Sequence, residues 1–214
     1  MKHSEILARI KQSRIVPIVR APNAGTALKA VQALREGGID CAEITMTVDN
    51  ALKALETLAD RHGDQMLLGA GTVLDPETAR SCMLAGAQFF VAPSLNLRTL
   101  AIARRYSRPI FPGALTPTEI LTAWESGADA IKVFPCSAVG GASYIKALKA
   151  PFPQIELFPT GGVNLDSIGE FLRAGSFAVG VGSELIDGKS IAEDNYQAIT
   201  ERAQRFREAA LRVP

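Results

Sequence analysis

Residues 127–141 read GADAIKVFPCSAVGG, and the centre of this stretch, DAIKVF (129–134), has the form of a buried strand. It is a short apolar segment that follows the glycine end of a helix-like stretch and leads into a glycine-rich turn. The same pattern recurs along the chain. Seven other segments share it: IVPIV (15–19), CAEITM (41–46), MLLGAG (66–71), QFFVAP (88–93), RPIFPG (108–113), QIELFP (154–159) and FAVGVG (177–182).

Helix-like stretches separate these segments, for example TALKAVQALREGG (26–38) and DPETARSCMLAGA (75–87). Strands that alternate with helices indicate a parallel sheet with right-handed crossovers, and eight such units predict a (β/α)8 barrel, an α/β fold. We expect a single domain over residues 1–214, with an extra N-terminal helix in MKHSEILARIKQSR (1–14). The alternative is a doubly wound open sheet, but its G-x-G-x-x-G fingerprint is missing after the first segment, where VRAPNAG (19–25) stands.

The composition and charge of the chain argue against several classes of protein. Apolar residues make up 47% of the chain and the net charge is +1, with charges interspersed, so we expect no nucleic acid and no membrane as partner. No apolar run approaches the roughly 20 residues that span a bilayer, and the N-terminus lacks the apolar centre of a secretory signal. The three cysteines share no close spacing, which suits a cytoplasmic protein. We expect no metal site, because no cluster of His, Cys and carboxylates has ligand spacing.

Lys132 stands in the middle of the segment quoted first. Side chains of a strand alternate between its two faces, so Lys132 shares a face with Ala130 and Phe134, opposite Ile131 and Val133. Branched residues suit the side that faces the helices, and Lys132 then points into the barrel near its mouth, where the functional groups of barrels gather. A desolvated lysine is partly neutral near pH 7 and can attack a carbonyl. The alternative is a structural lysine that is paired with an acid.

Glu43 lies in the second segment, on the same face as Thr45. A glutamate that points into the barrel beside an amine can carry protons. The competing interpretation is a buried Lys132–Glu43 ion pair that serves only stability, although such pairs often do not stabilise a protein. The two residues together predict an amine that captures an electrophile and an acid–base group that assists it.

Two glycine-rich turns follow the last two apolar segments. FPTGGVN (158–164) and VGVGSEL (179–185) occupy the places where barrels commonly hold a phosphate through backbone N–H groups and a helix N-terminus. The candidate phosphate ligands are Gly161, Gly162, Gly182 and Ser183.

Three further candidate site residues lie at the carboxyl ends of predicted strands. GAGTVLDP (69–76) places Thr72 at the end of the third strand, and VAPS (91–94) places Pro93 at the end of the fourth. Arg20 ends the first strand, and its guanidinium fork suits a carboxylate. A solvated surface arginine is equally compatible with the sequence at this position.

The motifs AEIT, GAGTV, KVFP, PTGGVN and GVGS, in this order, resemble those of the 2-keto-3-deoxy-6-phosphogluconate (KDPG) and 4-hydroxy-2-oxoglutarate (KHG) aldolases. The resemblance runs from residue 10 to residue 188. It implies a (β/α)8 barrel, a class I aldolase that needs neither metal nor organic cofactor, and a homotrimer.

The resemblance also implies roles for single residues. Lys132 matches the lysine that forms a Schiff base with the substrate, and Glu43 matches the acid–base glutamate. Thr72, Pro93 and Phe134 match residues at the pyruvate end of the site. The remaining matches are Thr160, near the substrate hydroxyls, and Gly161, Gly162, Gly182 and Ser183, at the phosphate.

Two positions depart from the pattern of the family. Many members carry an arginine for the substrate carboxylate where this chain has Thr47, and Arg20 on the neighbouring strand would replace it. Cys136 and Ser137 stand where many gluconate-type members have a small residue followed by Glu, which resembles the 6-phosphogalactonate aldolases. Those relatives tend to lack the threonine that Thr160 supplies, so the two features favour opposite configurations at C4. We give Thr160 more weight, because it should face the carbon that bears the hydroxyl.

We therefore expect reversible cleavage of 2-keto-3-deoxy-6-phosphogluconate to pyruvate and glyceraldehyde 3-phosphate, with 4-hydroxy-2-oxoglutarate as a further substrate. The first alternative is an aldolase for the galactonate epimer of the same phosphorylated keto-sugar acid. A second is a barrel that isomerises or decarboxylates a sugar phosphate, with Lys132 acting only through its charge. A third is a sugar-phosphate-binding protein without catalysis.

Overall fold

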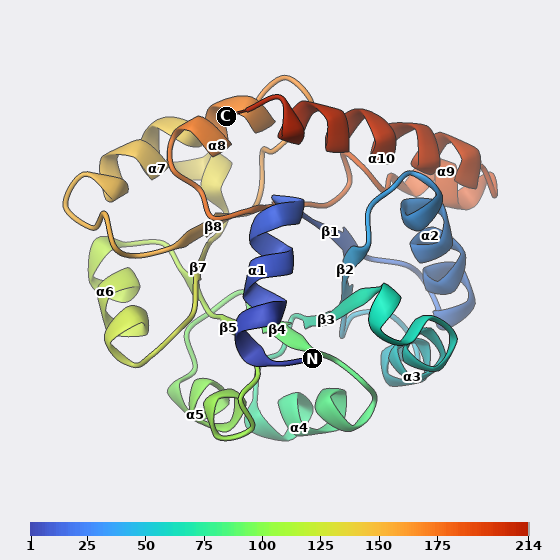
Figure 1. The fold of residues 1–214 in the computed structure, drawn as a ribbon, viewed down its shortest axis with the longest axis horizontal. Coiled ribbons are helices and arrows are strands. Elements are labelled where there is room, and N and C mark those ends of the chain that lie inside the picture. The colour runs from blue at the N-terminus through green and yellow to red at the C-terminus, as the bar shows by residue number, and fades with distance from the viewer. Residues whose placement is uncertain (214) are drawn as a thin grey trace.

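The strands of the protein lie in the centre of the molecule and the helices surround them, as the computed structural model of residues 1–213 shows (Figure 1). Every pairing between the strands of this part of the chain is parallel. The strands are β1 (Ile15–Val19), β2 (Cys41–Thr45), β3 (Leu67–Gly71), β4 (Phe89–Val91), β5 (Ile110–Phe111), β6 (Gly113–Ala114), β7 (Ile131–Val133), β8 (Leu157–Pro159) and β9 (Val179–Val181).

The predicted N-terminal helix is present as α1 (His3–Ser13). Several of the other helices begin at a side-chain cap. At the start of α4, for example, Asp75 accepts a hydrogen bond from the Thr78 N–H at 2.6 Å. None of the helices within residues 1–213 has both the length and the apolar character needed to cross a membrane. The other α-helices are α2 (Ala24–Glu36), α3 (Ala51–His62), α4 (Pro76–Leu84), α5 (Leu97–Arg105), α6 (Pro117–Glu125), α7 (Ala142–Lys149), α8 (Ile168–Arg173), α9 (Gly188–Ala192) and α10 (Tyr196–Leu211), and the short 3-10 helices are η1 (Gly63–Gln65) and η2 (Cys136–Val139).

The strands form two parallel sheets, in the orders β5-β4-β3-β2-β1-β9 and β6-β7-β8. Pro112 divides the predicted segment 108–113 into β5 and β6, because it has no N–H to donate to a ladder. Since β5 pairs with β4 and β6 pairs with β7, the chain passes from one sheet to the other at this proline. On the opposite side, Thr160 and Gly180 form an isolated bridge. The parallel α/β fold is confirmed, whereas closure of all strands into one (β/α)8 barrel stays a prediction.

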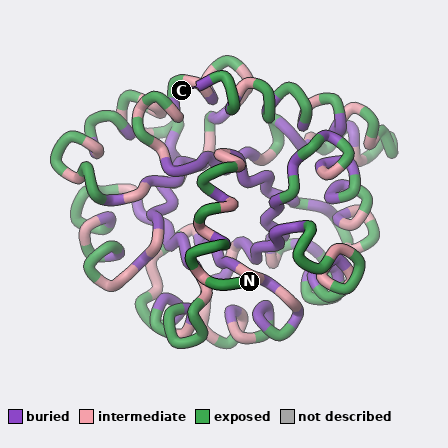
Figure 2. Tube along the Cα trace, in the orientation of Figure 1, coloured by how far each residue is buried: buried purple, intermediate pink, exposed green. Residues whose placement is uncertain are grey.

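Side chains along the strands alternate between two apolar cores. Ile131 and Val133 belong to the larger core, which lies between the strands and the helices. Ala130 belongs to a smaller core on the inner face of the strands, together with Phe111 and Phe158. The strands are accordingly the most buried part of the trace (Figure 2). Lys132 therefore shares the inner face with Ala130, as the alternation predicted.

The inner core is aromatic and lies at the amino ends of the strands. The ring of Phe111 lies 5.4 Å from that of Phe158, 5.9 Å from that of Phe177 and 6.0 Å from that of Phe89, measured between centroids. Such tilted and edge-to-face pairs add to the stabilisation that burial gives. Phe89 is the first residue of β4, which places the cluster at the end opposite the predicted site.

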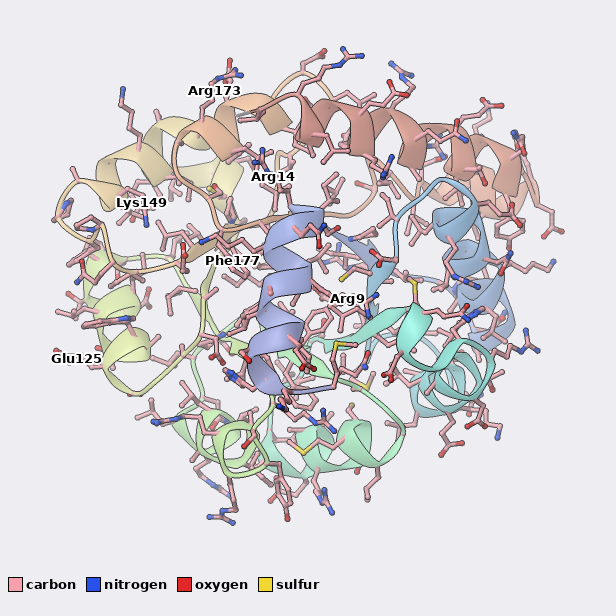
Figure 3. The ribbon with its side chains drawn as sticks, in the orientation of Figure 1. Arg9, Arg14, Glu125, Lys149, Arg173 and Phe177 are labelled. Carbon is pink, nitrogen blue, oxygen red and sulfur yellow. The ribbon has the colours of Figure 1, made fainter. Side chains whose placement is uncertain are left out.

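Helix α1 covers this aromatic core. It crosses in front of the strands in Figure 1, and its Ile6 and Ile10 are fully buried members of the inner core. Figure 3 labels Arg9 and Arg14 near this helix. Arg9 donates to Asp40 Oδ2 at 2.8 Å, and Arg14, directly after the helix, donates to the Ala210 carbonyl in α10 at 3.2 Å. Packing thus covers the amino ends of the strands, which leaves their carboxyl ends for a site.

Candidate functional site

Lys132 occupies the middle of β7 and is almost completely buried, with 2% of its surface exposed. Its neighbours in the two flanking strands are Gly113 in β6 and Phe158 in β8. The ammonium Nζ lies 5.1 Å from the centroid of the Phe134 ring, within the range of a cation–π contact. The sequence-based prediction that this lysine points inward is confirmed by its burial and by this contact.

Glu43 reaches the same interior from β2. It is completely buried, and neither carboxylate oxygen has a hydrogen-bond partner within residues 1–213. Room for the carboxylate comes from the neighbouring strand, where a β-carbon at position 71 would lie 1.8 Å from Glu43 Oε1. The glycine at this position is therefore required by the position of the acid.

The two buried groups influence each other through charge without forming a salt bridge. No N–O distance of 4.0 Å or less joins Lys132 to Glu43 in the described chain. Burial raises the pKa of the Glu43 carboxyl, and the positive charges of Lys132 and Arg20 oppose that rise. Burial lowers the pKa of the Lys132 ammonium, the charge of Glu43 opposes that fall, and the charge of Arg20 adds to it. Both groups are thus shifted toward their neutral forms, as acid–base and nucleophilic roles require.

Residues predicted for the pyruvate end lie next to these two groups. Phe134 contacts Lys132 as described above, and Pro93 lies against Gly113, the strand neighbour of Lys132. A β-carbon at position 113 would be 2.2 Å from the Pro93 carbonyl carbon. Thr72 directly follows the glycine beside Glu43, and its φ of 58° lies in the left-handed region, which is uncommon for a branched residue. Such backbone strain is frequent at functional sites.

A cavity of about 120 Å³ opens beside Phe134, where the sequence predicted a phosphate site. Gly161 and Gly162 have φ values of 93° and 80°, which only glycine adopts readily. Thr160 is 3% exposed, and its hydroxyl has no hydrogen-bond partner in the part of the chain described. The lining residues are Ile18, Arg20, Phe134, Thr160, Gly161, Gly162, Val163, Gly180, Gly182, Ser183 and Glu184.

Arg20 and Thr47, the two candidates for a carboxylate, occupy different places. Arg20 lies in the cavity, with Nη1 3.5 Å from the position of a β-carbon at Gly182. Thr47 is absent from the lining of that cavity, and its hydroxyl is hydrogen-bonded to the hydroxyl of Thr45 at 2.7 Å. Thr45 in turn donates to the carbonyl of Val19 at 3.2 Å. The structure thus brings Arg20 to the glycine loops and leaves Thr47 at the end of β2.

Sequence reasoning missed two glycines that shape the site. Gly71 makes room for Glu43, and Gly180 makes room for Thr160, whose Oγ1 lies 2.4 Å from the place of a β-carbon at position 180. In both cases a buried polar group without a partner lies against a bare Cα. The signal was available, because GAG (69–71) and GVG (180–182) place two glycines on the same face of a strand.

Metal ligands do not gather at this site or elsewhere in residues 1–213: no three His, Cys, Asp or Glu side chains lie close enough together there to hold an ion. The expectation that the protein needs no metal and no organic cofactor stays a prediction.

The opposing charges around Lys132 lead to a prediction about its pKa. Glu43→Gln removes the charge that raises this pKa, so the pKa should fall further, whereas Arg20→Ala removes a charge that lowers it, so the pKa should rise. Competitive acetylation over a series of pH values, analysed by mass spectrometry, measures both shifts, with the exposed Lys146 as internal reference. Shifts of the same sign in the two variants would contradict this electrostatic description.

Comparison with known proteins identifies the family of the chain. A family model described as "KDPG and KHG aldolase" matches residues 6–202. The chain is 34% identical over 200 residues to a 2-dehydro-3-deoxy-phosphogluconate aldolase of Treponema pallidum, which covers 94% of this chain and 95% of the relative. It is 35% identical over 196 residues to a 2-dehydro-3-deoxy-6-phosphogalactonate aldolase of Escherichia coli, with 91% of this chain and 95% of the relative covered.

A solved structure also resembles this one closely. The KDPG aldolase of Legionella pneumophila, with pyruvate captured at low pH as a covalent carbinolamine intermediate, superimposes with a TM-score of 0.86 at 32% identity and covers 93% of this chain and 96% of its own. These similarities confirm the predicted resemblance and the prediction of an enzyme of the lyase class. The chain belongs to the KDPG and KHG aldolase family.

Proposed function

We propose that the protein is a class I aldolase in which Lys132 forms a Schiff base with a 2-keto acid. The observation that carries this proposal is a buried lysine with a lowered pKa and no salt bridge, near enough to a fully buried glutamate for the glutamate charge to affect that pKa. A lysine that served only stability would be expected to contact its acid directly. The unpaired arrangement instead favours the neutral amine, which is the nucleophilic form.

In the proposed reaction, the neutral amine of Lys132 attacks the C2 ketone of the substrate, and loss of water gives a protonated imine. Glu43, as a carboxylate, then takes the proton of the C4 hydroxyl while the C3–C4 bond breaks. The electron pair of that bond moves to the imine nitrogen, which yields an enamine, and the aldehyde leaves. Glu43 returns its proton to C3, and water hydrolyses the new imine to pyruvate and free Lys132. No external oxidant or reductant is needed.

The other site residues would hold the substrate along its length. Thr72, Pro93 and Phe134 would surround the pyruvate end, and Arg20 would bind the carboxylate with Thr47 beside it. Thr160 would contact the hydroxyl-bearing carbons. Backbone N–H groups of the glycine turns would hold the phosphate, at Gly161, Gly162, Gly182 and Ser183.

For the substrate, we propose 2-keto-3-deoxy-6-phosphogluconate, cleaved to pyruvate and glyceraldehyde 3-phosphate, with 4-hydroxy-2-oxoglutarate as a smaller second substrate. The unpartnered Thr160 hydroxyl in the cavity supports this choice, because it offers a hydrogen bond to a substrate hydroxyl. Ser137 and the E. coli relative named for the galactonate compound favour the C4 epimer as the second candidate.

We further propose that the chain is one domain whose two sheets close into a (β/α)8 barrel. The single residue between β5 and β6 and the bridge between Thr160 and Gly180 support this closure. From the resemblance to the family we also propose a homotrimer located in the cytoplasm.

Borohydride trapping tests the covalent step. Sodium borohydride added with pyruvate should inactivate the enzyme and leave a reduced adduct on Lys132, located by peptide mass spectrometry. Glu43→Gln should keep the adduct but lose about 10²–10⁴-fold in turnover, the usual contribution of a positioned acid–base group. Adduct on Lys146 or Lys149, or none at all, would exclude the aldolase mechanism and favour a protein that binds or isomerises sugar phosphates.

Arg20→Ala tests the carboxylate site. The KM for pyruvate in the condensation direction and the KM for the sugar acid should rise together, by the equivalent of roughly 1.5–3 kcal/mol, the typical worth of a hydrogen bond to a charged group. Thr47→Arg added to this variant should restore part of the binding. Arg105→Ala, an exposed arginine on α5, serves as the control. A rise confined to phosphorylated substrates would instead assign Arg20 to the phosphate, near Gly182.

Thr160→Val tests the choice between the two epimers. The substitution keeps the shape of the side chain but removes its unpartnered hydroxyl. Assayed side by side, kcat/KM for the gluconate epimer should fall roughly tenfold relative to the galactonate epimer, the equivalent of one lost hydrogen bond. An unchanged ratio of the two values would show that Thr160 does not discriminate at C4.

A further inference from the structure

The carboxylate of Glu43 is held in position without any hydrogen bond from the rest of residues 1–213. Both oxygens are buried and neither has a partner, although the side chain is 0% exposed. Buried carboxylates are normally oriented by N–H or O–H donors. Another kind of contact must therefore fix this one.

That contact is with Gly71, at the end of the neighbouring strand β3. In the ladder between β2 and β3, Glu43 lies opposite Gly69 and Thr45 lies opposite Gly71. The end of the glutamate side chain leans over the second glycine: a β-carbon at position 71 would lie 1.8 Å from Oε1, 2.4 Å from Cδ and 2.5 Å from Cγ. Glu43 thus fills the space that any side chain at position 71 would need.

The backbone keeps Gly71 in a defined place. Its carbonyl accepts a hydrogen bond from the Met46 N–H at 2.8 Å, which ties it to the end of β2. The next residue, Thr72, has a left-handed φ of 58°, and the Val73 N–H donates to the Val91 carbonyl in β4 at 3.2 Å. Hydrogen bonds therefore connect the backbone around Gly71, which the Glu43 carboxylate contacts, to both β2 and β4.

We propose that Gly71 is a positioning residue whose bare Cα determines where the Glu43 carboxylate lies. Its absent side chain leaves room for the carboxylate beside β3. Proton transfer at C3 depends on this placement, whereas attack by Lys132 does not. The inference rests on the proposed function of Lys132 and Glu43.

The test separates these two steps in Gly71→Ala. Imine formation is measured by borohydride trapping of pyruvate on Lys132. Proton transfer is measured by exchange of the pyruvate methyl protons in D₂O, followed by NMR, since each exchange breaks a C3–H bond of the imine, passes the proton to Glu43 and leaves an enamine. Trapping should be retained, while exchange should fall by roughly 100-fold, within the range lost when a positioned acid–base group is misplaced.

Gly69→Ala is the matched control. It lies on the same face of the same strand, but the three atoms nearest to its β-carbon would all belong to the Phe89 ring, the first at 2.3 Å. This variant should lose stability without changing the ratio of exchange to trapping. An equal fall of that ratio in Gly69→Ala would show that crowding of β3, and not the position of Glu43, causes the loss.

Gly71→Ala can be tested even if it folds poorly, through a double-mutant cycle with Glu43→Ala that compares the stabilities of the variants. In urea unfolding, Gly71→Ala should lower the midpoint in the wild-type background and leave it unchanged in the Glu43→Ala background, where the clashing side chain is gone. Equal losses in both backgrounds, or unchanged exchange in Gly71→Ala, would overturn the proposal. Absence of an adduct in the wild type would refute the proposed function instead, and the cycle would still test the contact.

Discussion

The burial of two unpaired ionisable groups, Lys132 and Glu43, is the constraint on which the rest of the structure depends. Each would be more stable in water, and burial shifts both pKa values toward the neutral forms. Direct contact would let the two groups form an ion pair, which would hold the amine in its charged form. The two side chains lie on different strands without forming a salt bridge, and Gly71 on the strand beside β2 provides the space for Glu43.

Burial of Lys132 and Glu43 costs free energy, and the stabilisation that offsets this cost comes from other parts of the fold. The inner aromatic core and α1 cover the amino ends of the strands with apolar side chains such as Phe111 and Ile10. Burial of apolar surface stabilises by about 25 cal/mol per Å², so fully buried aromatic side chains can support a polar site at the other end. The larger core between strands and helices adds to this support without entering the interior.

Part of this arrangement could be predicted from the sequence alone. The alternation of Ala130, Lys132 and Phe134 with branched residues was sufficient to place the lysine on the inner face, because the period of a strand is fixed by its geometry. The α/β fold and the helix that precedes the first strand also followed from local patterns. These features depend on neighbours along the chain, which a sequence shows directly.

Other features depend on contacts between distant strands and could not be predicted in this way. The division of one expected strand at Pro112 depends on which strand lies on each side of it. The sequence shows the glycine pair of GAG (69–71), but which of the two glycines the Glu43 side chain leans over depends on the pairing of β2 with β3. The different locations of Arg20 and Thr47 depend on how side chains turn at the ends of β1 and β2, where strand periodicity no longer applies.

The bridge between Thr160 and Gly180 also has a consequence for the cooperativity of the fold. It joins the two sheets at a seam with a single ladder contact, and the cavity lined by Arg20, Gly162 and Gly182 lies across that seam. A molecule in this cavity touches both sheets at once, so its binding energy also opposes their separation. Local opening at weakly paired strands costs less than global unfolding. A ligand bound in the cavity would thus protect the backbone amides on both sides of the seam and would act as a structural cross-link between the two sheets.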